Sequence, residues 1–138
     1  MPVYSLTSRK TLSTAKKQQL VDLFTDAHCS IMVAPEQFVH VLFSDGIPIF
    51  DRKSLYIHAN VRQGRTPQTI EKMRETLIEG CAKILNVKAN KIHINILEIQ
   101  AKWIMEGGYI MPDPGEEDEW MEKVTKDLAA RENSLVQK

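Results

Sequence analysis

Pro2 is the residue whose type and position suggest chemistry most directly. We expect removal of the methionine before this small residue, which would leave Pro2 as the amino terminus. Its ring nitrogen would then be a secondary amine instead of an amide nitrogen. Ordinary α-amino groups titrate at about 7.7–8.0, and burial among apolar side chains would lower the pKa of such an amine because it disfavours the ammonium form. The amine could then transfer protons near neutral pH. The alternative is that Met-Pro is a common start and that Pro2 is inert.

Two arginines surround a glycine in the segment Arg62-Gln63-Gly64-Arg65, between a predicted strand and a predicted helix. Guanidinium groups bind carboxylates through paired hydrogen bonds, and a helix amino terminus adds a favourable potential for an anion. The segment therefore predicts a binding site for an organic acid. Two solvated loop arginines are the alternative.

Glu106 and His28 are the other candidate site residues. Glu106 follows the apolar Trp103-Ile104-Met105 and precedes two glycines. A carboxylate in such surroundings could activate a water molecule. His28 lies near the end of the first predicted helix and could donate a hydrogen bond to an anionic ligand. A surface acid and a helix cap are the respective alternatives.

Familiar motifs of metal and cofactor sites are absent from the sequence. It contains no GxxxxGK[ST], GxGxxG, HExxH, GxSxG or CxxC motif. The four histidines, His28, His40, His58 and His93, lie on different predicted elements without the spacing of metal ligands. The sequence therefore predicts neither a metal site nor a cofactor.

Alternating strand and helix patterns must position these residues. Ser13 is a predicted helix N-cap, and Thr66-Pro67 combines an N-cap hydroxyl with proline in the first turn. Period-two and helical patterns predict, in chain order, a strand over 2–7, a helix over 14–32, a buried strand over 38–43, a strand over 55–60, a helix over 67–85 and a strand over 92–97.

This order predicts an α/β (α+β) fold of two β-α-β halves, about 1–45 and 53–100, within a single domain spanning 1–138. The halves would form a four-stranded mixed sheet with two helices on one face. Residues 101–138 would be a C-terminal extension with a loop and a short helix that begins near Glu116, followed by a frayed polar tail after Arg131. The other sheet face would lack cover, which predicts an oligomer.

Composition restricts the function classes. The chain has 138 residues, of which 43% are hydrophobic, and its 18 basic and 18 acidic residues balance. Zero net charge argues against nucleic acid or an anionic membrane surface as a partner. Two cysteines exclude a disulfide scaffold, and the longest apolar runs are too short for a bilayer. No secretory signal pattern is visible, so we expect a cytoplasmic protein.

The sequence resembles the tautomerase superfamily, and within it the cis-3-chloroacrylic acid dehalogenase group. The resemblance runs from Pro2-Val3-Tyr4 to about Trp120 and depends on four segments: Thr25-Asp26-Ala27-His28, Arg62-Gln63-Gly64-Arg65, Met105-Glu106-Gly107, and Pro112-Asp113-Pro114-Gly115 leading to Glu119-Trp120. It implies a tautomerase-like fold and a homotrimer.

The resemblance also implies roles for the candidate residues. Pro2 would be the catalytic amine, Glu106 would activate water, and three side chains would hold the carboxylate of a small acid: His28, Arg62 and Arg65. Asn95 stands where the dehalogenase group carries a water-assisting tyrosine. An amide can orient water but has no phenol, so this departure favours the simpler chemistry.

Three functions follow as hypotheses. The first is keto–enol tautomerisation of a small 2-oxo acid, with neutral Pro2 as base. The second is hydration or hydrolytic dehalogenation of a short unsaturated acid, with protonated Pro2 as acid and Glu106 activating water; decarboxylation of a 3-oxo acid is a variant with the same cationic cradle. The third is a non-catalytic binding protein on the same fold.

Overall fold

The computed structural model describes residues 2–137, so Met1, whose removal the sequence analysis expects, lies outside the described residues. The chain divides into two compact units, which are described separately. The first unit contains the residues up to Val61 together with Arg65–Glu98, and the second contains Arg62–Gly64 and the chain from Ile99 onward. A single domain spanning 1–138 stays a prediction.

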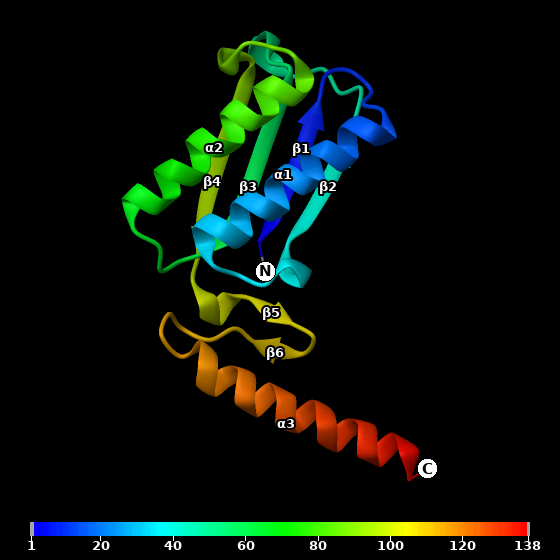
Figure 1. Cartoon of the computed structure of the whole chain (residues 1–138), viewed down its shortest axis with the longest axis vertical. Coiled ribbons are helices and arrows are strands. Elements are labelled where there is room, and N and C mark those ends of the chain that lie inside the picture. The colour runs from blue at the N-terminus through cyan, green and yellow to red at the C-terminus, as the bar shows by residue number, and fades with distance from the viewer. Residues whose placement is uncertain (1, 138) are drawn as a thin grey trace. The chain divides into compact units, whose positions relative to one another are not determined.

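The first unit is built on a four-stranded sheet in the order β2-β1-β3-β4. Its strands are β1 (Val3–Ser8), β2 (His40–Ser44), β3 (Leu55–Arg62) and β4 (Ile92–Ile99). β1 pairs parallel to β2 and antiparallel to β3. The helices α1 (Thr14–Met32) and α2 (Pro67–Leu85) lie side by side across one face (Figure 1). The predicted mixed sheet with two helices on one face is confirmed.

Local capping explains why both helices begin, and why α2 ends, where the sequence predicts. The Ser13 side chain accepts from the Lys16 N–H at 3.1 Å, and the Thr66 hydroxyl accepts from the Thr69 N–H at 3.1 Å. Each bond satisfies an amide that has no partner within its helix. Asn86 ends α2 in the left-handed conformation, with φ 53°.

The core lies between the sheet and the two helices. Alternate residues of the central strands, including Tyr4 and Leu6 of β1 and Ile57 of β3, are buried against helical residues such as Phe24 and Leu77. The opposite sheet face has no helix over it within the described unit (Figure 1). The open face, as we call it, is made of twelve strand residues: Val3, Ser5, Thr7, His40, Leu42, Ser44, Tyr56, His58, Asn60, His93, Asn95 and Leu97.

The prediction of a buried strand over 38–43 was wrong in its burial and its start. Residues Glu36–Phe38 form a short 3-10 turn, and β2 begins at His40. β2 is an edge strand, in which Val41 and Phe43 pack against the core while Leu42 is 58% exposed on the open face. A continuous apolar run is therefore compatible with an edge strand as well as with a buried strand.

The second unit contains a hairpin and a long helix. β5 (Met105–Glu106) and β6 (Tyr109–Ile110) pair antiparallel. They are joined by Gly107 and Gly108, whose φ angles of 57° and 86° fit a two-residue primed turn. The sequence predicted only a loop here.

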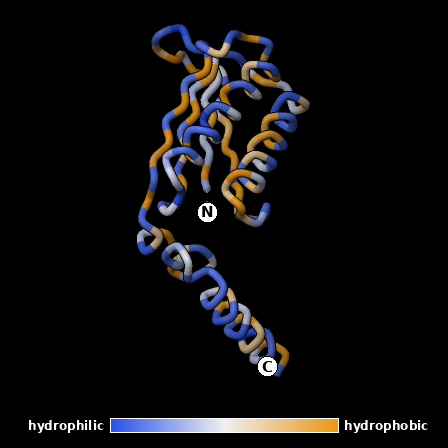
Figure 2. Tube along the Cα trace, turned by 60° about the vertical axis from the view of Figure 1, so that its left-hand side comes forward, coloured by the Kyte–Doolittle hydropathy of each residue, from blue (hydrophilic) through white to orange (hydrophobic). Residues whose placement is uncertain are grey.

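The last helix is longer than expected. α3 (Glu117–Val136) has 20 residues, so it continues through the predicted frayed tail after Arg131. Trp120 Nε1 donates to the Ile110 carbonyl at 2.8 Å, and the Arg131 guanidinium lies 5.4 Å from the centre of the Tyr109 ring. These contacts attach α3 to the hairpin over several turns. Most residues of α3 are hydrophilic (Figure 2). No helix among residues 2–137 is long and apolar enough to cross a membrane.

Candidate active site

Pro2 lies at the head of the central strand β1 and is buried. Its carbonyl accepts a hydrogen bond from the His40 N–H at 3.1 Å, which continues the pairing of β1 with β2. Sheet neighbours on both sides of β1 hold the backbone that follows Pro2. The predicted catalytic residue therefore directly precedes a strand that is paired on both sides.

Tyr4 and His28 form a buried pair on the helix-covered side of this strand. The Tyr4 hydroxyl and His28 Nδ1 are 2.6 Å apart. Tyr4 is completely buried, and only 2% of His28 is exposed. The Tyr4 ring also packs edge-on against Phe24, with ring centroids 5.0 Å apart. His28 is therefore held inside the unit and does not project from the end of α1.

Burial decides the protonation of this pair. Burial, and then the positive charge of Arg65, lower the pKa of His28 to about 4, so its imidazole is neutral at pH 7. Burial raises the pKa of the Tyr4 phenol, although the charge of Arg65 opposes this. The phenol therefore keeps its proton at any pH at which the protein would work.

Arg65 is the cation of the first unit's cluster. Its Nη2 donates to the Met32 carbonyl, at the long distance of 3.5 Å. Met32 ends α1, and Val33 after it takes the left-handed conformation with φ 53°. The guanidinium thus stands at the carbonyl end of α1, where a positive charge is favoured. Its field reaches both Tyr4 and His28.

Arg62, the other predicted arginine, is held by the second unit. Its Nη1 donates to the Pro112 carbonyl at 2.8 Å, and its Nη2 lies 2.8 Å from Glu117 Oε1. Glu117 also accepts from the Gly115 N–H at 2.8 Å. Burial raises the pKa of Glu117, but hydrogen bonds from its own amide, Arg62 and Gly115 lower it overall. A substrate carboxylate at Arg62 would compete with this carboxylate.

Gly64 keeps the chain beside Arg62 close to its neighbour. Its φ is 119°, and a Cβ at this position would lie 2.4 Å from Pro114 Cγ. The adjacent Gln63 N–H donates to the Ile99 carbonyl at 2.8 Å. Only glycine fits a backbone that is both left-handed and in contact with a proline ring.

Glu106 and Asn95 are not members of the Tyr4 cluster, for different reasons. Glu106 belongs to β5 of the second unit, where it is half-buried and paired with Tyr109. Asn95 belongs to the first unit but lies on the open face, with its Nδ2 3.4 Å from His58 Nδ1. The sheet separates Asn95 from Tyr4. The first unit thus brings together Tyr4, His28 and Arg65, and Pro2 directly precedes the strand that carries Tyr4.

Tyr4 is the site residue that the sequence analysis missed. From the sequence, Tyr4 was only part of the predicted strand over 2–7 and of the segment Pro2-Val3-Tyr4 with which the resemblance begins. The available signal was its spacing, because a residue two positions after Pro2 in a strand must point to the same face.

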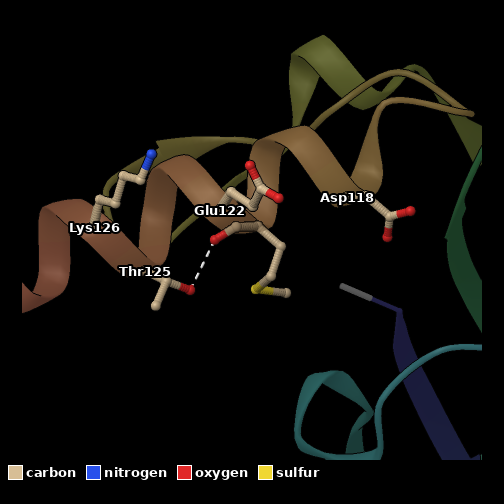
Figure 3. Close-up of a pocket in the computed structure, with 5 residues that line it drawn as sticks. Asp118, Glu122, Thr125 and Lys126 are labelled. Atoms are coloured by element: carbon tan, nitrogen blue, oxygen red, sulfur yellow. Dashed lines mark hydrogen bonds between the residues drawn. The ribbon is translucent and has the colours of Figure 1, made fainter.

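Among residues 2–137, no group of three or more His, Cys, Asp or Glu side chains is placed to hold a metal ion. A groove of about 550 Å³ runs along α3 (Figure 3). It contains none of the predicted site residues and is lined by Asp118, Met121, Glu122, Thr125 and Lys126.

Comparisons with known proteins identify related folds. No model of a protein family matches the sequence, and no curated protein matches it. The crystal structure of N1, a member of the cis-3-chloroacrylic acid dehalogenase family, superposes with a TM-score of 0.79 at 27% identity, covering 93% of this chain and 99% of N1.

Two further structures cover less of this chain. A fused 4-OT, solved as an asymmetric trimer, has a TM-score of 0.71 at 20% identity and covers 78% of this chain and 94% of its own. Pt0534, solved after inactivation by 2-oxo-3-pentynoate, has a TM-score of 0.71 at 18% identity, with 79% and 94% covered.

Proposed function

We propose that this chain, which has the fold of the tautomerase superfamily, is an amino-terminal-proline enzyme that catalyses keto–enol tautomerisation of a small 2-oxo acid. The observation that carries the proposal is the cluster of Tyr4, neutral His28 and Arg65 in the unit in which buried Pro2 directly precedes β1. This cluster offers a cation and a neutral hydrogen-bond donor beside the strand that carries the proposed base.

The proposed reaction is a proton relay on Pro2. The neutral ring nitrogen takes the proton of the enol hydroxyl, the electrons of the O–H bond form the carbonyl, and the neighbouring carbon takes a proton back from the ring nitrogen. Arg65 neutralises the carboxylate, with Arg62 as a second cation, and His28 donates to the oxygen on which charge develops. The inactivation of Pt0534 by 2-oxo-3-pentynoate supports a small 2-oxo acid as the substrate class.

The proposed assembly is a homotrimer that covers the open face. The fused 4-OT, which shares the fold, forms a trimer. An uncovered sheet face with Leu42 at 58% and Leu97 at 50% exposure is an area that a second copy would bury. Asn95 keeps its proposed role of orienting water only in an assembly that brings the open face of one copy to the site of another.

Hydration of a short unsaturated acid is the second candidate. The similarity to N1 favours it, because N1 belongs to a dehalogenase family and covers more of this chain than the fused 4-OT does. In this reaction protonated Pro2 gives a proton to the substrate carbon, and Glu106 takes one from the attacking water. The candidates differ in the protonation state of Pro2 at the working pH.

The function is tested by removing the proline from a protein of verified amino terminus. Mass spectrometry should show that Met1 is absent. Pro2→Ala should then slow ketonisation of phenylenolpyruvate by about 10²–10⁴-fold, the range of one general acid–base group. Gln19→Ala, on the exposed side of α1, is the control and should leave the rate unchanged. An unchanged rate in Pro2→Ala, or full activity with Met1 retained, would contradict the proposal.

Glu106→Gln separates the two candidates. Tautomerisation needs no activated water, so its rate should largely survive this change. Hydration of a 3-haloacrylate or a 2-oxo-3-alkynoate should fall by about 10²-fold or more, because the base for water is removed. Equal losses in both assays would contradict this division of roles.

A further inference from the structure

We infer that Tyr4 is a positioning residue that fixes the tautomer of His28, so that Nε2 carries the proton and donates to the oxygen of the bound acid. The part of this inference that concerns the bound acid rests on the proposed function. The part that concerns the tautomer rests on the structure of the first unit alone.

The geometry of the Tyr4–His28 pair supports this inference. The distance of 2.6 Å between the Tyr4 hydroxyl and His28 Nδ1 is short for a hydrogen bond between neutral groups. Both strand partners of Tyr4 are known, Val41 on β2 and Ala59 on β3, so its backbone is held from two sides. Phe24 fixes the phenol ring edge-on. The hydroxyl is therefore presented to His28 by a rigid part of the sheet.

The number of protons in the pair supports it as well. A neutral imidazole has one N–H, and a phenol has one O–H. If Nδ1 carried the imidazole proton, the Tyr4 oxygen would have to accept it, and the buried O–H would need another acceptor. If the phenol donates instead, one bond satisfies both the O–H and Nδ1, and the Nε2–H is left to donate to the bound acid. The Tyr4 O–H therefore donates to an unprotonated Nδ1, and the proton of His28 is on Nε2.

Burial of His28, and then the nearby charge of Arg65, disfavour a second proton on its imidazole. The cluster therefore divides two tasks between two residues. Arg65 supplies the positive charge for a carboxylate, and His28 supplies a directed neutral N–H. A neutral donor with fixed orientation stabilises a developing enolate oxygen without delivering a full proton to it.

The direct test is nitrogen NMR of the protein labelled with ¹⁵N-histidine at pH 7. We expect the shifts of His28 to show a protonated Nε2 and an unprotonated Nδ1. A protonated Nδ1, or an imidazolium, would overturn the inference. This measurement needs neither a variant nor a substrate, so it remains decisive if the proposed function is wrong.

Tyr4→Phe tests whether the phenol sets the tautomer. The change keeps the ring that packs on Phe24 and removes the donor to Nδ1. We expect the His28 shifts to move toward a mixture of the two tautomers. Tyr56→Phe is the matched control, since Tyr56 stacks on His93 on the open face at a centroid distance of 4.9 Å and the ring is retained. It should leave the His28 shifts unchanged. An unchanged tautomer in Tyr4→Phe would overturn the role of Tyr4.

Kinetics connect the tautomer to turnover. If the proposed function holds, Tyr4→Phe should lower kcat by about 10-fold, as expected for one hydrogen bond, with little change in KM. Gln19→Ala, on the exposed side of α1, should change neither constant. An unchanged kcat in Tyr4→Phe, while Pro2→Ala is inactive, would overturn the inference and leave the proposed function intact. Inactivity of the wild type on every 2-oxo acid would contradict the proposed function without changing the NMR result.

Discussion

At the scale of single residues, burial changes what His28 can do. An exposed histidine near a helix end would be a pH-sensitive cation that caps carbonyl groups. His28 is 2% exposed and stands beside the charge of Arg65, so its pKa falls to about 4. The side chain thereby becomes a neutral hydrogen-bonding group, which is the form that an enolising site can use.

The depressed pKa of His28 predicts a pH dependence of stability. In the unfolded chain a histidine titrates near 6.5, whereas in the folded protein His28 stays neutral down to about 4. Between these pH values the unfolded state binds the extra proton, so the free energy of unfolding should fall as the pH falls. The total loss should approach about 3 kcal/mol. Urea unfolding at several pH values between 7.5 and 4 measures it.

His28→Asn is the control for this loss. Its amide oxygen can accept from the Tyr4 hydroxyl, but the side chain does not titrate. The difference in unfolding free energy between wild type and variant should therefore shrink as the pH falls from 6.5 to 4. Carboxylates with lowered pKa, such as Asp45 and Glu117, contribute equally to both proteins. Parallel pH profiles would show that His28 is not the group that titrates.

At the scale of elements, features that depend on nearby residues could be predicted from the sequence, whereas features that depend on long-range contacts could not. Both caps of the first unit's helices, Ser13 and Thr66, were read correctly because a cap depends on residues within one turn. The β5–β6 hairpin was missed although Gly107-Gly108 is a suitable turn, since its strands have only two residues each. The length of α3 was missed because it depends on contacts with the hairpin, such as that of Arg131 with Tyr109.

The candidate site shows the same limit. Pro2, His28 and Arg65 could be selected by residue type and by resemblance. The hydrogen bond between Tyr4 and His28 joins β1 to α1 across 24 positions, and no local pattern predicts it. The ion pair of Arg62 with Glu117, 55 positions away, likewise forms only in the folded second unit, and no local pattern predicts it.

The loop at Gly64 gives a prediction at this scale. Gly64→Ala should destabilise the second unit by about 1–3 kcal/mol, because the new methyl group would overlap the Pro114 ring. The displaced loop should also disturb Arg62, which donates to the Pro112 carbonyl. Thermal unfolding and limited proteolysis of the C-terminal segment measure the effect.

Gly115→Ala is the matched control for this change. Gly115 also has a positive φ, 93°, but a methyl group there meets no atom within 4 Å. It therefore carries the backbone strain without the overlap, and its loss of stability should be smaller. Equal losses in both variants would assign the effect to φ alone and contradict the importance of the Pro114 contact.

At the scale of the whole molecule, the open face is the part of the first unit's sheet that no helix of that unit covers. Across its middle, Leu42 pairs with Ser5, Ser5 pairs with His58, and His58 contacts Asn95. Among its twelve residues there is no carboxylate and no lysine. A surface of small polar groups, rings and aliphatic side chains that carries neither carboxylate nor ammonium groups is suited to burial against a second copy.

Leu42→Lys should therefore prevent the proposed trimer. In one copy Leu42 lies on an edge strand and is 58% exposed, so lysine is tolerated there and the fold should persist. In an assembly that buries the open face, each copy would bring an unpaired ammonium group out of water, at a cost of several kcal/mol. Sedimentation should show monomers for Leu42→Lys at concentrations where the wild type is trimeric.

Gln19→Lys adds the same charge to the exposed side of α1 and should leave the trimer intact. A stable trimer of Leu42→Lys would mean that the copies associate through another surface, and the open face would then need a different explanation.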